Sequence, residues 1–284
     1  MKYLVLFGLL SLSLFAQKPS LLVIIDTGVG PECVSTGALL HRAFVPDVSY
    51  DLWQGRPGFR DHSGHGSHVS GVVWQQLRAL HHAQEPSLCM LRAGYGKFPV
   101  GTLLKAFEHL GSLREKGYEV PVILCSFALD PAKTNPVAFA KFKEALLAEL
   151  KRGTIIVSST DGRGKDLDQL KPRERFLPGC LIHPNLITVA VSSKDGFPAP
   201  RACSGKKTVF CSAEGTRLKS CWNDGSLRKI SGSSQAAAVV AATAFHLSPG
   251  RDSIRQVLKK HGKRNPGLLT QTASEVYFKF QGEQ

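Results

Sequence analysis

The 284-residue sequence lacks tandem repeats and low-complexity tracts, and after residue 16 it lacks any apolar run long enough to cross a bilayer. These absences exclude a repeat protein and a transmembrane segment in the mature chain. Hydrophobic residues make up 43% and charged residues 20%, which is ordinary for a globular protein. The length is sufficient for one large α/β domain with a sizeable core.

Motifs for zinc and for nucleic acid are also absent. No CxxC pair and no Cys/His spacing suggests a zinc site. Acidic residues are few, with 22 Asp and Glu against 36 Lys and Arg, and the net charge is +14. Such a basic surface can favour anionic partners such as lipid head groups, acidic polymers or acidic proteins. The basic residues are scattered and no recognition motif accompanies them, so we expect no specific nucleic-acid binding.

The first 16 residues have the layout of a secretory signal. Lys2 gives a positive start, residues 3–15 are almost wholly apolar, and polar residues follow Ala16. We predict a signal peptide over residues 1–16, with cleavage after Ser13 as an alternative site, and a secreted or periplasmic location. A buried first strand and a retained anchor are the competing interpretations.

Seven cysteines are present, and an exported chain permits disulfides. Cys203, Cys211 and Cys221 are close together in a region rich in Gly, Ser and Lys, which predicts a bridge within this trio. Because seven is odd, at least one thiol should stay free. Cys125, inside the apolar run 122–125, is the best candidate for a buried free thiol.

Apolar runs alternate with helical patterns along the chain. We predict strands over 21–25, 88–91, 122–127, 154–158 and 186–191, and helices over 65–80, 100–113, 136–152, 234–246 and 252–260. This alternation predicts a three-layer α/β fold, with a mostly parallel sheet flanked by helices. Asp26 and Ser126 then lie at strand ends, and His65 and Ser234 at helix starts, so one rim of the sheet can assemble a site.

Three blocks carry the chemistry of a serine nucleophile. They are LVIIDTG over 22–28, GHGSHVSG over 64–71 and SGSSQAAA over 231–238. Serine needs a base to activate its hydroxyl, and the base needs a carboxylate to hold its tautomer. Asp-Thr-Gly also starts aspartic protease sites, but that chemistry needs two such carboxylates. The chain has no second Asp-Thr-Gly or Asp-Ser-Gly, which excludes a single-chain aspartic protease.

Together the three blocks resemble the subtilisin-like serine proteases over about residues 20–260. The His block is similar to that family's His-Gly-Thr-His-Val-Ala-Gly, and the Ser block to Gly-Thr-Ser-Met-Ala. The resemblance implies a serine endopeptidase domain over residues 17–284, with Asp26, His65 and Ser234 as the triad in the order Asp, His, Ser. Intervals of 39 residues from Asp26 to His65, and 169 from His65 to Ser234, suit that domain.

The same resemblance implies how a protein or peptide substrate binds. Ser126, Phe127 and Ala128 match the strand that pairs with an extended substrate backbone, although the segment could equally be a core strand. No cofactor is required. Structural calcium is known in the family, but no Asp-rich loop here demands it.

Asp161 stands where the family has the Asn of the oxyanion hole, beside the backbone N–H of Ser234. An ionised carboxylate would repel the oxyanion, and losing one donor costs about 10²–10³ in rate. Three interpretations follow: Asp161 donates when protonated, catalysis is slow, or the chain binds without cleaving. On the first, we expect an acidic or mildly acidic pH optimum.

Other departures from the family pattern lie near the serine and at the N-terminus. Gln235 replaces the family's Met and Ala238 its Pro, and no pro-region is recognisable between residue 16 and Asp26. A catalytically weak or inactive subtilase-fold protein that acts as a binding module is therefore the alternative to an endopeptidase.

Overall fold

The computed structural model describes residues 18–35, 38–80, 87–248, 253–264 and 276–282. The predicted signal peptide lies outside these residues. The helices are α1 (His65–Ala79), α2 (Val100–Glu115), α3 (Pro136–Lys151), α4 (Ser233–Leu247) and α5 (Ile254–His261). The strands are β1 (Ser20–Asp26), β2 (Val34–Ser35), β3 (Ala38–Leu39), β4 (Tyr50–Asp51), β5 (Arg56–Pro57), β6 (Ser87–Arg92), β7 (Glu119–Cys125), β8 (Ile155–Ser159), β9 (Leu186–Ser192), β10 (Cys211–Glu214), β11 (Leu218–Cys221), β12 (Leu227–Ile230), β13 (Lys263–Arg264) and β14 (Val276–Phe278).

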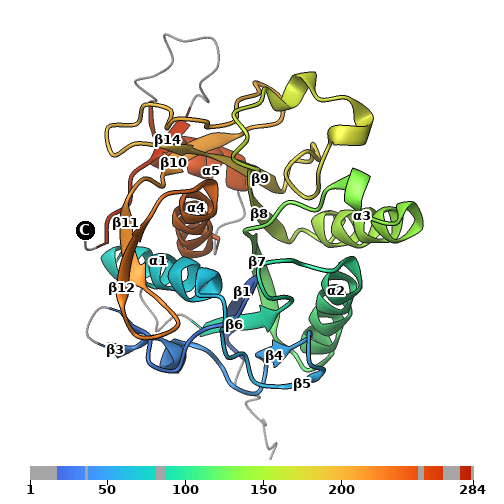
Figure 1. The fold of residues 1–284 in the computed structure, drawn as a ribbon, viewed down its shortest axis with the longest axis vertical. Helices are drawn as coiled ribbons and strands as arrows, with labels where there is room; N and C mark the ends of the chain where they lie inside the picture. Colours follow the sequence, from blue (N-terminus) through green and yellow to red (C-terminus); the bar gives the residue numbers. More distant parts are fainter. Residues whose placement is uncertain (1–17, 36–37, 81–86, 249–252, 265–275, 283–284) are drawn as a thin grey trace, which may run out of the picture.

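A mostly parallel sheet forms the centre of the molecule (Figure 1). In the described part of the chain it has ten strands in the order β13-β14-β10-β9-β8-β7-β1-β6-β4-β5. Only the outermost pairs, β13–β14 and β4–β5, are antiparallel. β1 lies between β7 and β6, so its end at Asp26 faces the middle of one sheet edge.

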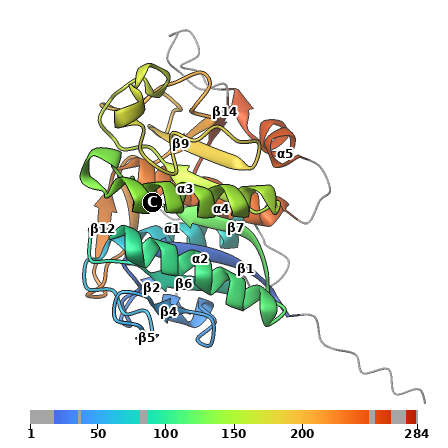
Figure 2. The same ribbon diagram turned by 90° about the vertical axis from the view of Figure 1, so that its right-hand side faces the viewer.

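Helices cover both faces of the sheet, as Figure 2 shows from the side. Alternate residues of β1 point to opposite faces, since side chains alternate along a strand. Leu22 and Ile24 pack in the core under α1, α4 and α5, whereas Leu21, Val23 and Ile25 pack under α2 and α3. This gives the predicted three-layer α/β fold.

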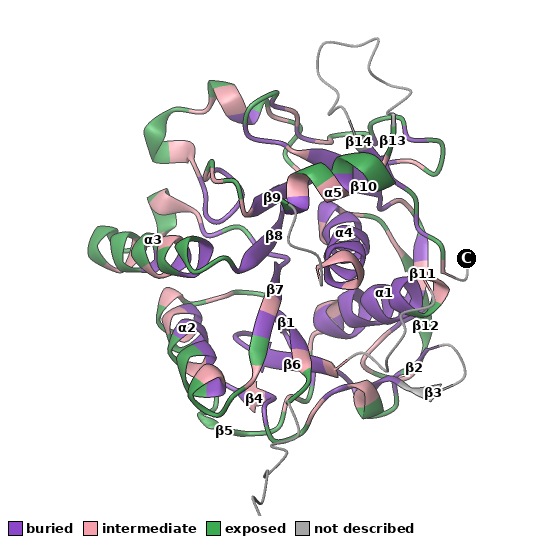
Figure 3. Cartoon of the chain, turned by 180° about the vertical axis from the view of Figure 1, so that it is seen from behind, coloured by how far each residue is buried: buried purple, intermediate pink, exposed green. Residues whose placement is uncertain are grey.

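The two helices that begin at the predicted site are the most deeply buried. α1 and α4 are buried along nearly their whole lengths, whereas α2 and α3 have exposed outer faces (Figure 3). The small Ala side chains of α4 let it pack closely against α1 and the central strands. His65 and the segment around Ser234 are thus held by rigid core elements.

The structure contains short strands that the sequence did not predict (β2, β3, β4, β5, β13 and β14), and it differs from the prediction at β7 and over 203–230. β7 ends at Cys125, two residues before the predicted end, because the chain leaves the sheet at Ser126. The region over 203–230, for which no strand is predicted, contains β10 in the main sheet and the β11–β12 hairpin. The strand signal is weak there because β11 and β12 have only four residues each, and β12 has two adjacent charged residues in place of alternation.

The disulfide prediction was wrong. Cys221 bonds to Cys33, 188 residues away, and not to Cys203 or Cys211. Cys211 is enclosed in the central sheet on β10, while Cys221 lies on the hairpin beside α1, so closeness in sequence does not bring them together. Cys125 is free and buried, as predicted. Among the described helices, none is long and apolar enough to cross a membrane.

Candidate active site

Asp26 and His65 meet at the rim of the sheet. Asp26 is the last residue of β1 and is buried, and its Oδ1 lies 2.7 Å from Nδ1 of His65, the first residue of α1. The backbone N–H of Thr27 donates to the same Oδ1 at 2.7 Å. The Nδ1 contact selects the tautomer that leaves Nε2 of His65 free to accept a proton.

The surroundings of His65 favour its charged form. Burial lowers the pKa of the imidazole, but the charge of Asp26, its hydrogen bond and the charge of Asp61 together outweigh burial. The net pKa of His65 is raised above 6.5. An imidazole of this kind is a base whose protonated form is stabilised by the carboxylate behind it.

A second carboxylate positions the start of α1. Asp61 accepts hydrogen bonds from the backbone N–H groups of Ser63, Gly64 and Ser67, and from the Ser67 hydroxyl at 2.7 Å. It thereby does the work of an N-cap side chain, which Gly64 cannot supply. Gly66 is required because a Cβ there would lie 2.4 Å from the Gly28 carbonyl oxygen. This close approach sets β1 and α1 in the register that joins Asp26 to His65.

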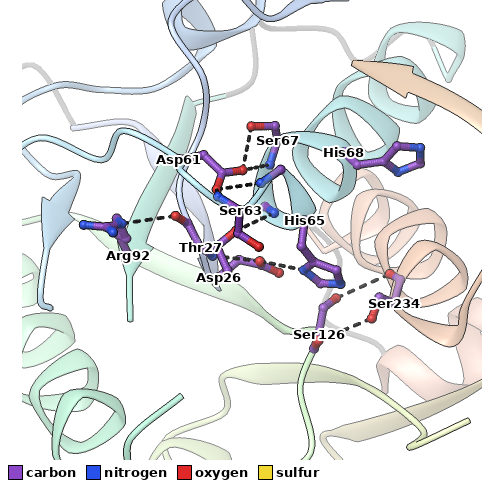
Figure 4. Close-up of polar contacts among 12 residues, drawn as sticks. Asp26, Thr27, Asp61, Ser63, His65, Ser67, His68, Arg92, Ser126 and Ser234 are labelled. Carbon is purple, nitrogen blue, oxygen red and sulfur yellow. Dashed lines mark hydrogen bonds and ion pairs between the residues drawn. The ribbon is translucent and has the colours of Figure 1, made fainter. Parts of the chain in front are cut away.

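Thr27, which follows Asp26, links the turn after β1 to a buried ion pair. The Thr27 carbonyl accepts a hydrogen bond from Nε of Arg92 at 3.2 Å, and the guanidinium of Arg92 also pairs with Asp51. Thr27 in addition accepts a hydrogen bond from the Gly66 N–H through its hydroxyl. Figure 4 shows the hydrogen bond from Arg92 to Thr27, with Thr27 next to Asp26. Hydrogen bonds from Arg92 and from Gly66 therefore both hold the turn after β1 in place.

Ser234 lies on the side of the His65 imidazole away from Asp26 (Figure 4). It is in the first turn of α4, where backbone N–H groups have no acceptor within the helix. Its Oγ donates to the Ser126 carbonyl at 3.3 Å, and the Ser126 hydroxyl donates to the Ser234 carbonyl at 3.4 Å. Among the described residues no hydrogen bond joins Ser234 to His65, and the Ser234 hydroxyl bonds instead to Ser126, which follows β7.

A cleft of about 900 Å³ extends from this point. Its lining includes the three predicted substrate-binding residues, Ser126, Phe127 and Ala128, together with His65. The other lining residues are Thr27, Ser63, Gly96, Lys97, Phe98, Pro99, Val100, Leu129, Asp130, Lys133, Thr134 and Asn135. Because residues 126–128 follow the end of β7, the cleft runs along a backbone that has left the sheet.

Asp161, the predicted oxyanion residue, has other partners. Its Oδ1 accepts from the Arg163 backbone N–H and from the Cys203 thiol, each at 3.1 Å, and its Oδ2 pairs with the Arg163 guanidinium. In all three contacts the carboxylate oxygens accept hydrogen bonds. No hydrogen bond within the described part of the chain joins Asp161 to Ser234.

Sequence reasoning missed the role of His68. Its Nε2 lies 3.1 Å from the carbonyl oxygens of Leu218 and Arg228, and its Nδ1 lies 3.4 Å from Nε2 of Gln235. His68 therefore links α1, the β11–β12 hairpin and the residue after Ser234. Burial lowers the pKa of His68 to about 4. The departure from the family pattern at Gln235 was the available signal, since its amide can bond to an imidazole and a Met cannot.

A metal site would need several ligands in one place. Within the residues that the structure describes, no three His, Cys, Asp or Glu side chains are grouped as a metal ion would require.

Known proteins resemble this chain in structure, whereas the sequence comparisons find no match. No family model and no curated protein sequence matches the chain. Solved structures do match. A cold-adapted subtilisin-like serine proteinase has a TM-score of 0.73 and 18% identity, over 93% of this chain and 89% of that one.

Two further matches are described as a lanthipeptide protease and a leader peptide processing serine protease. A lanthipeptide protease has a TM-score of 0.72 and 16% identity, over 92% of this chain and 86% of that one. The epidermin leader peptide processing serine protease of Staphylococcus aureus has a TM-score of 0.70 and 17% identity, over 93% and 74%. At these identities the likeness shows the architecture: the chain has the three-layer fold of the subtilisin-like serine proteases.

Proposed function

We propose that this chain is a serine endopeptidase, with Ser234 as nucleophile, His65 as general base and then acid, and Asp26 as the carboxylate that orients His65. The observation that carries the proposal is the 2.7 Å Asp26–His65 contact at the head of a cleft, with Ser234 on the other side of the imidazole. The fold shared with serine proteases supports it.

Turnover begins when the Ser234 side chain rotates from the Ser126 carbonyl toward Nε2 of His65. His65 accepts the hydroxyl proton as Oγ attacks the substrate carbonyl, and Asp26 stabilises the imidazolium that forms. His65 then donates this proton to the leaving amine, and an acyl-enzyme remains on Ser234. Water, activated by the same imidazole, hydrolyses the ester and restores the serine.

The oxyanion site of this proposal has one clear donor. The backbone N–H of Ser234 has no acceptor among the described residues and lies in the first turn of α4, where the helix dipole favours negative charge. By the family pattern the second donor would come from residue 161, and Asp161 would have to release Arg163 and take up a proton before it could donate. We infer slow catalysis when Asp161 is ionised.

The substrate in this proposal is a protein or peptide that lies extended along residues 126–128. Two proteins of the same fold act on leader peptides or lanthipeptides by their descriptions, which supports a peptide substrate. The Cys33–Cys221 disulfide fits an oxidising compartment, and with the predicted export signal it supports a secreted or periplasmic protein.

A fluorophosphonate probe tests the nucleophile directly. The unaltered chain should be labelled, and labelling should disappear in Ser234→Ala and fall strongly in His65→Ala. Ser112→Ala is the matched control, since it removes an exposed hydroxyl on α2 from a residue that does not line the cleft. Absence of labelling across pH 4–9 in folded protein would overturn the proposal.

The second candidate is a subtilase-fold binding module with little turnover. It is favoured by two observations: Ser234 bonds to Ser126 instead of His65, and Asp161 is held by Arg163 and Cys203. On this alternative, peptides bind to the cleft of the unaltered chain and of Ser234→Ala equally well, and neither protein forms an acyl-enzyme.

A further inference from the structure

The floor of the cleft is apolar. Phe98 and Phe127 pack with ring centroids 5.2 Å apart, and Leu129 and Val100 continue this surface. Phe127 and Leu129 are buried beneath the cleft, with 6% and 8% of their surfaces exposed. A floor of this kind accepts an apolar side chain of a bound peptide and does not itself select for charge.

The rim of the cleft is basic. Lys97 lies in the loop before α2, and Lys133 lies in the turn before α3, so the two ammonium groups come from different elements. Both residues are exposed, and neither side chain has an ion pair or hydrogen bond with any described residue. These two cations are therefore available to a ligand.

Asp130 is the one carboxylate among the described residues that line the cleft, and it is hydrogen-bonded to the backbone. Oδ1 of Asp130 accepts from the Ala132 N–H at 2.9 Å and so caps the turn over 131–133. The lining thus contains two lysines and one aspartate beside His65. Its charge is positive, and it becomes more positive when His65 is protonated.

We propose that this cleft selects peptides in which an acidic side chain lies close to an apolar one, and that Lys97 and Lys133 are the specificity-determining residues. This inference rests on the proposed function for the cleavage step but not for the binding step. The apolar side chain packs on Phe98 and Phe127, and the carboxylate reaches the ammonium groups above them.

The proposal predicts the size of the preference. An exposed ion pair contributes little, and two such pairs at a partly enclosed cleft change affinity by about fivefold. Salt screens these charges, since the Debye length falls from about 8 Å at physiological ionic strength to about 3 Å at 1 M. The preference for an acidic side chain should therefore decrease at high salt, whereas contact with the apolar floor should not.

The experiment uses fluorescent peptides with an apolar background and one Glu, placed in turn at each position, against matched peptides with Gln. Binding is measured by anisotropy with Ser234→Ala, and cleavage with the unaltered chain. At one or more positions Glu should improve Kd and kcat/KM about fivefold. The double variant Lys97→Gln/Lys133→Gln should bring the Glu-to-Gln ratio close to one, whereas Lys97→Arg/Lys133→Arg should retain it.

Lys151→Gln is the matched control, because it removes the same charge at the far end of α3, about 22 Å from the first residue of that helix. It should leave the ratio unchanged. A ratio near one in the unaltered chain, an unaltered ratio in the Gln double variant, or no peptide binding at all would overturn the inference. Binding that favours Glu without any cleavage would support the inference and refute the proposed endopeptidase.

Discussion

The protonation state of His65 controls the proposed chemistry at the scale of single residues. Only a neutral imidazole can accept the Ser234 proton, and the charge and hydrogen bond of Asp26, with Asp61, raise the pKa of His65 despite its burial. The acidic pH optimum expected if Asp161 donates is therefore in conflict with His65, which must be neutral to act as the base. Because proton acceptance by His65 is required for every turnover, we now expect activity on the neutral to alkaline side.

A pH–rate profile measures this directly. We expect kcat/KM to increase with pH through a midpoint above 6.5, the ordinary pKa of histidine. Asp26→Asn should move the midpoint down and lower kcat by about 10⁴, the effect known for the corresponding change in a serine protease. A midpoint at or below 6.5 in the unaltered chain would contradict a raised pKa of His65.

Asp161 gives a second prediction for a single residue. Asp161→Asn removes the charge that pairs with Arg163 and provides an amide N–H that can donate to an oxyanion. We expect kcat at neutral pH to increase by at least about tenfold, with KM little changed, since one oxyanion donor is worth about 10²–10³.

Arg163→Gln is the control for that change, because it also breaks the pair but adds no donor at residue 161. It should not raise kcat. If Asp161→Asn leaves kcat unchanged, the second oxyanion donor comes from another residue and the family pattern does not apply at this position.

At the scale of elements, His68 holds three parts of the site together. It lies three residues after His65 on α1, bonds to both strands of the β11–β12 hairpin, and contacts Gln235 one residue after Ser234. Trp222 packs edge-on against its ring, with centroids 6.4 Å apart. The bonds to two carbonyl oxygens require a proton on Nε2, and the Gln235 amide then donates to Nδ1.

The stability of this junction should depend on pH. In the unfolded chain His68 binds a proton near pH 6.5, whereas in the folded protein it does so only near pH 4. The unfolded state binds more protons between these values, so the free energy of unfolding should decrease as pH falls from 6.5 to 4, by on the order of 3 kcal/mol.

Urea unfolding at several pH values tests this prediction. His68→Gln should lose this part of the pH dependence, whereas His62→Gln, which removes an exposed histidine, should keep it. An identical slope in all three proteins would show that His68 does not titrate in this range.

At the scale of the whole molecule, one covalent link joins distant parts of the chain. Cys33, in the loop after β1, and Cys221, on β11, are both buried and close a loop of 188 residues. The link ties the segment after Asp26 to the hairpin that His68 also holds. A loop of this length restricts the unfolded chain strongly.

We expect the variant Cys33→Ala/Cys221→Ala to lose about 2–5 kcal/mol of unfolding free energy. A reductant in the thermal unfolding assay should lower the Tm of the unaltered chain and leave that of the double variant unchanged. Equal Tm values for the two proteins without reductant would refute a stabilising role of the bridge.

The fold class and the meeting of Asp26 with His65 could be predicted because their determinants are local. Apolar runs of strand length and helical periodicity predict β1, α1 and α4 within one or two residues. Parallel strands end at one edge of a sheet, so a carboxylate after a strand and an imidazole at a helix start converge there. The role of these residues and of Ser234 in catalysis is still a prediction.

The partners of Asp161, Cys221 and His68 could not be predicted, because they depend on which remote segments become neighbours. Cys203 lies 42 residues from Asp161, and Leu218 lies 150 residues from His68. The amino-acid sequence alone predicted the three-layer fold through the pattern of its apolar residues, and it supplied the triad candidates through its resemblance to a known family. Only tertiary packing decided that Asp161 binds Arg163 and Cys203, that Cys33 bonds to Cys221 and that Lys97 and Lys133 share a cleft, since each contact depends on the relative placement of separate elements.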